Sequence, residues 1–217
     1  MNNINFYKYI KIITSDNTPI QIKNRTIFFL RNLESDEAAD ALSRCICKKS
    51  VLLDHEIAYV LGQMRRRCSI SFLFQLAGDP SHSPIVRHEA IEALGNYQDK
   101  NLINDLQVFL KSEIDLVRES AILAIDKLKL TGEGNVSKYG SHDPAYPYAS
   151  NDINILKDMF MEGTLTEKYQ ALFKLRDINT KESIMVLAEG FKDPSALLRH
   201  EVAYVFGRWK IQMQFLY

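Results

Sequence analysis

The chain has 217 residues, of which 46% are apolar, with 27 Lys and Arg against 27 Asp and Glu. This composition is typical of a globular protein and excludes a disordered or collagen-like chain. The zero formal net charge argues against a nucleic-acid or membrane-surface partner held by bulk electrostatics. No apolar run approaches the roughly 18 residues of a membrane span. Three cysteines and no signal-peptide pattern predict buried free thiols in a reducing cytoplasm.

Apolar residues recur three and four positions apart along almost the whole chain, which predicts helices and no strands. The expected helices cover 3–13, 19–33, 35–48, 50–62, 69–77, 83–94, 99–111, 114–129, 152–162, 165–178, 180–191 and 195–210. Capping residues beside proline, at Ser83-Pro84 and at 193–195, predict two helix starts, and Gly62 and Gly95 are expected to end helices. The helices pair into hairpins about every 31 to 35 residues, a period typical of a stacked α-solenoid.

The helical pattern stops between 131 and 151, where Gly, Pro, Ser and Tyr dominate. Residues 1–130 are predicted to form an N-terminal half of four hairpins, 131–151 a linker, and 152–217 a C-terminal half of two hairpins. A shift of 145 positions aligns 28–31 with 173–176 and Leu52–Gly62 with Leu197–Gly207, and most residues of the longer stretch are identical. The sequence therefore predicts an all-α solenoid of two duplicated halves, the second one incomplete.

Adjacent His and Glu residues occur in three of the predicted helices. The pairs are His55-Glu56, His88-Glu89 and His200-Glu201. Successive helical residues point about 100° apart, so each pair lies on one side of its helix, a side that Leu52 shares with the first pair. The other residues are nearly all apolar, which is typical of an inner helix. Placing carboxylates there costs several kcal/mol each unless a cation or hydrogen bonds compensate.

Two interpretations of these pairs remain open. The pairs could be structural, as satisfied core histidines or as partners of Arg87 and Arg199, which directly precede two of the histidines. The stretch 117–120 supports this structural interpretation, because it aligns with 86–89 one repeat earlier but lacks the histidine. The repetition of one context in three helices favours a metal site instead. Imidazole and carboxylate ligands with open positions suit iron or manganese, and zinc also accepts these ligands.

Six stretches carry a family resemblance: Leu52–Met64, Val86–Gly95, Asp143–Pro147, Tyr169–Asp177, Leu187–Gly190 and Ala196–Gly207. They resemble deoxyhypusine hydroxylase, and the resemblance covers about residues 20 to 209. It implies a HEAT-repeat oxidoreductase of two symmetric halves that hold a di-iron centre, with two Fe(II) in a complete site. The implied activity is that of a cytoplasmic monooxygenase. It would use O2 to hydroxylate the deoxyhypusine side chain of a translation initiation factor, the last step of hypusine formation.

The same resemblance assigns roles to individual residues. The first iron site of the family corresponds to His55, His88 and Glu89, and the second corresponds to His200 alone. Glu56 and Glu201 correspond to the carboxylates that bind the substrate amine, and they are the candidate catalytic and substrate-binding residues.

The duplication also predicts a fourth His-Glu pair near position 233, beyond Tyr217. On this basis the second iron site is expected to be incomplete. Three outcomes stay open: a chain without activity, which this pattern favours, a site that a partner chain completes, or a site with one iron and altered chemistry. The alternative function is a non-catalytic HEAT-repeat scaffold that binds a protein partner, and a relative of the HEAT-like bilin lyases is a third hypothesis. Neither a nucleic acid nor a membrane is an expected partner.

Overall fold

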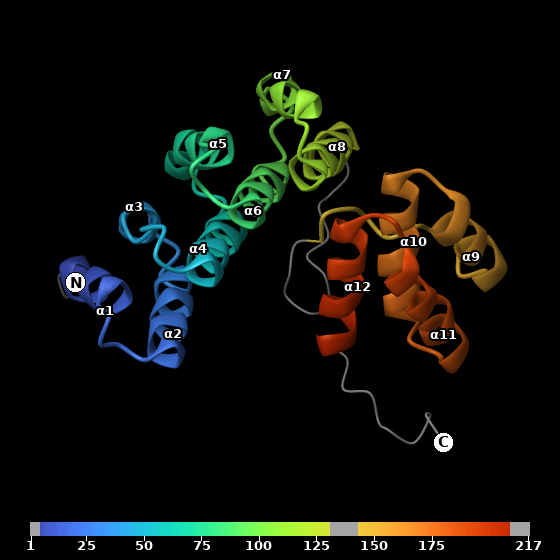
Figure 1. The fold of residues 1–217 in the computed structure, drawn as a ribbon, viewed down its shortest axis with the longest axis horizontal. Coiled ribbons are helices and arrows are strands. Elements are labelled where there is room, and N and C mark those ends of the chain that lie inside the picture. The colour runs from blue at the N-terminus through green and yellow to red at the C-terminus, as the bar shows by residue number, and fades with distance from the viewer. Residues whose placement is uncertain (1–4, 131–142, 209–217) are drawn as a thin grey trace. The chain divides into compact units, whose positions relative to one another are not determined.

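The computed structural model describes residues 5–130 and 143–208 (Figure 1). The chain divides into two compact units, residues 1–128 and 129–217, and each is described by itself. Every regular element within the described ranges is a helix, so the predicted all-α class is confirmed. None of the described helices is long and apolar enough to cross a membrane.

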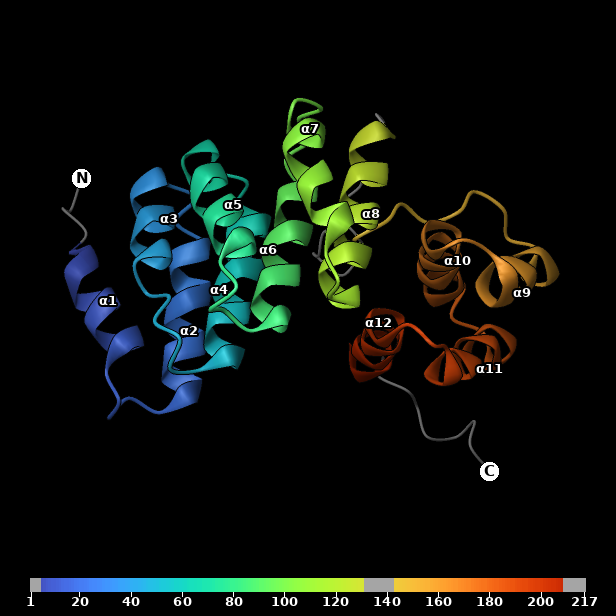
Figure 2. The same ribbon diagram turned by 45° about the horizontal axis from the view of Figure 1, so that its top comes forward.

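Unit 1 consists, in its described part, of helical hairpins stacked in two layers (Figures 1 and 2). One layer holds α1 (Phe6–Thr14), α3 (Asp36–Ser43), α5 (Ile70–Gly78) and α7 (Leu102–Leu106). The other holds the partners α2 (Ile20–Arg31), α4 (Val51–Met64), α6 (Pro84–Gly95) and α8 (Asp115–Lys129). The 3-10 turns Arg67–Ser69 and Gln107–Lys111 precede α5 and follow α7. In the second layer α2 packs on α4 and α4 on α6, so neighbouring hairpins bury each other's apolar faces.

Unit 2 repeats the hairpin twice in its described part. It contains α9 (Ile153–Glu162), α10 (Leu165–Ile178), α11 (Lys181–Glu189) with the 3-10 turn Gly190–Lys192, and α12 (Ala196–Arg208). Its core is aromatic, because Phe160, Tyr169 and Phe173 are almost fully buried. The rings of Tyr169 and Phe173 meet edge to face, with their centroids 6.0 Å apart.

The duplication is visible in the helix boundaries. The helices α10, α11 and α12 begin at Leu165, Lys181 and Ala196, each 145 residues after the start of α2, α3 and α4. The 145-residue shift found in the sequence therefore pairs these helices of unit 2 with the helices of unit 1 that occupy the same position in a hairpin.

Side-chain caps fix several helix starts. The Ser83 hydroxyl accepts a hydrogen bond from the amide of Ile85, and the Ser195 hydroxyl accepts one from Leu198, which confirms both starts predicted from capping residues beside proline. The Thr164 hydroxyl caps α10 together with Glu167 in a capping box.

The prediction that Gly62 ends a helix is wrong, because α4 continues to Met64 and ends at Arg65, whose φ is 50°. The glycine serves the packing of α4 on α6 instead. A Cβ at Gly62 would lie 2.7 Å from both Cα and Cβ of Ala93, which is closer than atoms can approach. Gly95 does end α6 as predicted, and a Cβ there would lie 3.1 Å from Cα of Ala124.

The helix predicted over 35–48 ends five residues early, at Ser43. The loop that follows is bound to the next helix through Asp54, whose side chain is buried. The Asp54 carboxylate accepts hydrogen bonds from the amides of Cys47 and Lys48, at 3.2 and 2.9 Å. Local periodicity could not predict this ending, because the contact depends on α4.

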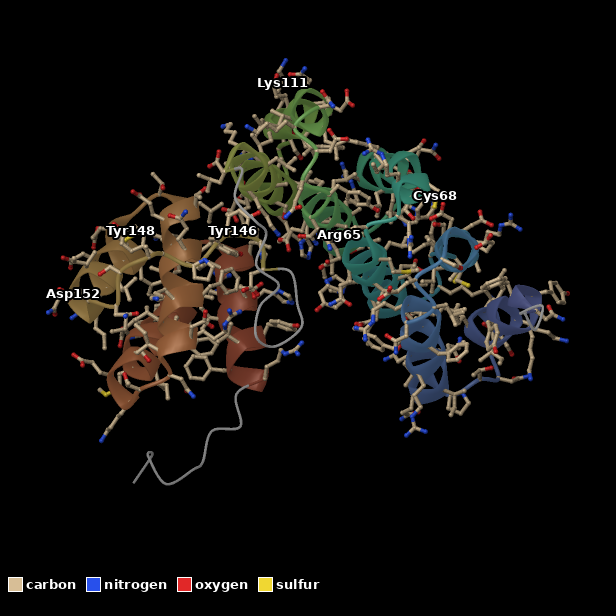
Figure 3. The ribbon with its side chains drawn as sticks, turned by 180° about the vertical axis from the view of Figure 1, so that it is seen from behind. Arg65, Cys68, Lys111, Tyr146, Tyr148 and Asp152 are labelled. Carbon is tan, nitrogen blue, oxygen red and sulfur yellow. The ribbon has the colours of Figure 1, made fainter. Side chains whose placement is uncertain are left out.

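The segment before α9 is bound to α10 by a buried ion pair. The Arg176 guanidinium donates to both oxygens of Asp143, at 2.8 Å each, and it lies 4.9 Å from the ring centroid of Phe173. The amide of Tyr148, labelled in Figure 3, donates to the carbonyl of Gln170. The second part of the predicted linker is therefore an ordered segment that covers α10.

The three cysteines are free thiols, as expected. Cys45 is buried, and burial raises the pKa of its thiol to about 12. Cys47 is only half-buried, and Cys68, labelled in Figure 3, is exposed in the 3-10 turn between α4 and α5. The prediction that all three are buried is therefore wrong for these two residues.

Candidate metal centre

Two neighbouring helices of unit 1 bring three of the expected metal ligands together. His55 lies on α4, and His88 and Glu89 lie on α6, which packs directly against α4. One ligand atom from each residue lies within 4.8 Å of the others. Nε2 of His55 is 3.0 Å from Oε2 of Glu89, and the two imidazole centroids are 5.6 Å apart. The sequence expectation for these residues and the geometry therefore point to the same group.

This group is largely shielded from solvent. The exposed fractions of His88 and Glu89 are 3% and 7%, and the His55 side chain is 18% exposed. A carboxylate in such surroundings needs a cation or hydrogen bonds to offset its lost hydration. Two imidazoles and one carboxylate around a common point are a donor set that suits a divalent transition metal such as iron.

The electrostatics of the group follow from this burial. Burial lowers the pKa of His55, but the hydrogen bond and the charge of Glu89 outweigh it, so the pKa lies above its ordinary value. Burial raises the pKa of Glu56, which is half-buried beside the group, and the charge of Glu89 adds to that rise. The charges of His55 and of Arg31 act against it. A carboxylate of this kind is stabilised by an additional cation.

The arginines that precede two of the histidines bind backbone carbonyls within their own hairpins. Nε of Arg87 donates to the carbonyl of Ala77 at 2.8 Å, and Nη1 of Arg199 donates to the carbonyls of Asp193 and Pro194, at 2.6 and 2.9 Å. In α8, Arg118 makes the equivalent bond to the carbonyl of Ser112. Arg118 and Arg199 thus hold the turn before their own helix, and Arg87 holds the last turn of α5. These contacts weaken the hypothesis that the arginines exist to neutralise the His-Glu pairs.

The side of α4 that carries His55 and Glu56 is less buried than the sequence suggested. Leu52, one turn before Glu56, is 63% exposed. The near-continuous apolar pattern of α4 therefore predicts more burial than the helix has. Beside the candidate ligands, α4 is therefore open to solvent at Leu52.

In unit 2, α12 carries the other two candidate residues. Glu201 is buried, with an exposed fraction of 9%, whereas His200 is exposed. Among the described residues, the group on α4 and α6 is the only one in which three or more His, Cys, Asp or Glu side chains could share a metal ion. His200 and Glu201 are not part of it, and their roles stay predictions.

A cavity in unit 1 lies away from these residues. It has a volume of about 320 Å³ and is lined by Met64, Arg65, Arg67, Ile70, Tyr97 and Asp99. Figure 3 labels Arg65 at this bend between α4 and α5. Arg67 pairs with Asp99 at 2.8 Å, and no His-Glu residue lines the cavity.

Known proteins with similar sequences decide the family. Deoxyhypusine hydroxylase of Drosophila pseudoobscura pseudoobscura is 35% identical over 204 residues, which cover 91% of this chain and 68% of the relative. The enzyme of Rattus norvegicus is 38% identical over 205 residues, with the same two coverages. This chain belongs to the deoxyhypusine hydroxylase family. The resemblance drawn from the six sequence stretches is thereby confirmed, although no family model matches the chain.

A solved structure supports the same assignment. Human deoxyhypusine hydroxylase, determined in complex with glycerol, matches this fold with a TM-score of 0.88 and 34% sequence identity. The match covers 94% of this chain and 73% of the human one. The predicted helical-repeat solenoid is therefore the architecture of the deoxyhypusine hydroxylase family.

Proposed function

We propose that this member of the deoxyhypusine hydroxylase family is an iron-dependent monooxygenase that hydroxylates the deoxyhypusine side chain of a translation initiation factor. The observation that carries the proposal is the buried group of His55, His88 and Glu89, whose ligand atoms lie within 4.8 Å of one another. The family's dependence on iron supports Fe(II) as the ion. The donor set agrees, because two imidazoles and one carboxylate with open positions are typical of non-haem iron oxygenases.

The three residues would hold the first Fe(II), and His200 would contribute to the second of the two ions that a complete site contains. Iron, with O2 as co-substrate, would supply the oxidising chemistry that no protein side chain provides. The chain's own contribution is then to fix the ligands and to keep water from the buried side of the group.

Glu56 and Glu201 are proposed to bind the substrate amine. Deoxyhypusine is a long, cationic side chain, and a carboxylate beside the metal would orient it for reaction. Glu56 lies next to His55 on α4 and is half-buried, so an incoming ammonium group would offset the cost of its burial. The exposed Leu52, with an exposed fraction of 63%, lies one turn away and offers an apolar contact to an alkyl chain.

Anaerobic titration with Fe(II), followed by calorimetry and by the melting temperature, tests the metal centre. We expect at least one ion per chain and a stabilisation that grows with free metal, because a ligand that binds only the native state stabilises it by mass action. H88A should remove the stabilisation. H82A is the matched control, because His82 belongs to the loop before α6 and pairs with Asp79. Unchanged iron binding by H88A would contradict the proposed metal centre.

The substrate assignment needs a separate measurement. The iron-loaded chain is mixed with deoxyhypusine-containing initiation factor, and the affinity is compared with that for the same factor carrying an unmodified lysine. We expect E56Q to lose most of the preference for the modified factor, and mass spectrometry after admission of O2 reports the gain of one oxygen atom. A non-catalytic scaffold would instead bind both factors equally, with or without metal.

A further inference from the structure

We propose that Glu92 and Ser120 are positioning residues that fix the orientation of His88 for metal binding. This inference rests on the proposed metal centre and extends it by a second layer of contacts. Neither residue belongs to a His-Glu pair, and neither was singled out in the sequence.

The first contact lies within α6. Glu92 follows His88 by four residues, so both side chains lie on the same face of the helix. Oε1 of Glu92 is 3.5 Å from Nδ1 of His88, which is longer than a regular N–H···O hydrogen bond and corresponds to an electrostatic contact. The two side chains are 13% and 4% exposed. An acidic residue so shielded, beside an imidazole, is held by specific contacts rather than by solvent.

The second contact joins Glu92 of α6 to a residue of α8, in the next hairpin. The Ser120 hydroxyl of α8 donates to Oε1 of Glu92 at 3.3 Å, and Ser120 is fully buried. Ser120 occupies in α8 the place that Glu89 occupies in α6, because Val117–Ser120 stands where Val86–Glu89 stands one repeat earlier. The repeat that lost its His-Glu pair thus supports the pair of its neighbour.

This chain of contacts selects one form of the imidazole. A carboxylate beside Nδ1 keeps the proton on that nitrogen, which leaves the Nε2 lone pair for a metal ion. Carboxylate partners of this kind also raise the basicity of the ligand and limit its rotation. The Ser120 hydroxyl in turn limits the rotation of the Glu92 carboxylate.

Anaerobic Co(II) and Fe(II) titrations of E92Q, E92A and S120A test the proposal, with E113Q as the control because Glu113 is exposed. We expect E92A to weaken metal affinity about 10- to 100-fold, the range typical of lost carboxylate partners of metal-bound histidines. E92Q keeps an acceptor near Nδ1 but loses the charge, so its loss should be smaller, and S120A should lose several-fold. The d–d absorption of bound Co(II) should change in E92A and stay unchanged in E113Q.

The measurements separate this inference from the metal centre itself. Wild-type affinity and an unchanged Co(II) spectrum in both E92A and E92Q, together with lost binding in H88A, would overturn the role of Glu92 and leave the centre standing. Retained binding in H88A would overturn the centre and the inference with it. If E92A fails to fold, by far-UV circular dichroism without metal, the near-isosteric E92Q decides alone, and wild-type affinity there contradicts the proposal.

Discussion

The helices α4 and α12 are copies of one sequence, yet their His-Glu pairs have different surroundings. On α4, His55 lies 3.0 Å from Glu89 of the next inner helix, and Glu56 is half-buried beside it. On α12, His200 is exposed and Glu201 is buried. The difference arises because α6 packs against α4, whereas no described helix follows α12. A His-Glu pair therefore becomes part of a candidate metal-binding group where a neighbouring repeat supplies further ligand atoms.

The aligned arginines Arg31 and Arg176 also have different partners in the two units. Arg31 donates to the neutral side chains of Gln63 and Asn32. Its copy, Arg176, pairs with Asp143 and Asp177 and is only 5% exposed. Burial lowers the pKa of Arg176, but the two carboxylates outweigh it and raise that pKa above its ordinary value. In unit 2 this arginine is therefore part of a buried ion pair, whereas in unit 1 the charge of its copy partly opposes the rise that burial causes in the pKa of Glu56.

The largest expected difference concerns the two histidines of the duplicated helices. H55A should reduce Fe(II) affinity by about 100-fold or more, because one of the three proposed ligands is lost from a buried group. H200A should leave the binding of the first ion within about threefold of wild type, since the proposed ligands of that ion all lie in unit 1. Anaerobic calorimetry on both variants makes the measurement. Equal losses in the two variants would contradict the contrast between α4 and α12.

The next effect concerns the two arginine partners. D143A should destabilise the protein by about 3–5 kcal/mol, because it leaves the Arg176 guanidinium buried without its main counter-charge. Q63A removes one hydrogen bond to the half-buried Arg31 and should cost about 1 kcal/mol. Urea unfolding followed by far-UV circular dichroism gives both values. A loss below 1 kcal/mol for D143A would show that the ion pair contributes little to unit 2.

The smallest effect compares the glycines Gly62 and Gly207, which are also copies. G62A should destabilise the protein by about 1–3 kcal/mol, because its Cβ meets the backbone of α6. At Gly207 no atom of the described residues lies within 4 Å of the added Cβ, so G207A should be neutral or stabilising by up to about 1 kcal/mol through helix propensity. Thermal unfolding of the two variants shows the difference in sign. A destabilised G207A would indicate a contact on that side of α12.

Helix positions were the most predictable part of the fold. The 3.6-residue periodicity and the caps at Ser83 and Ser195 placed the helices, and the shift of 145 residues anticipated that α12 copies α4. Where prediction failed, as at Gly62 and after Ser43, a contact between helices decided the local structure. Glu92 was also missed, although its position four residues after His88 was a usable signal.

The sequence by itself determined the helical class, the duplication, the family and the identities of the candidate ligands, because these depend on local pattern and on motif similarity. The resemblance also implied that His55, His88 and Glu89 belong together, but only the tertiary structure shows how their side chains meet. His55 and His88 are 33 residues apart in the chain, and they become neighbours because Gly62 lets α4 approach Ala93 of α6 closely. The packing of backbones, which no single helix contains, thus converts a repeated motif into one shared group.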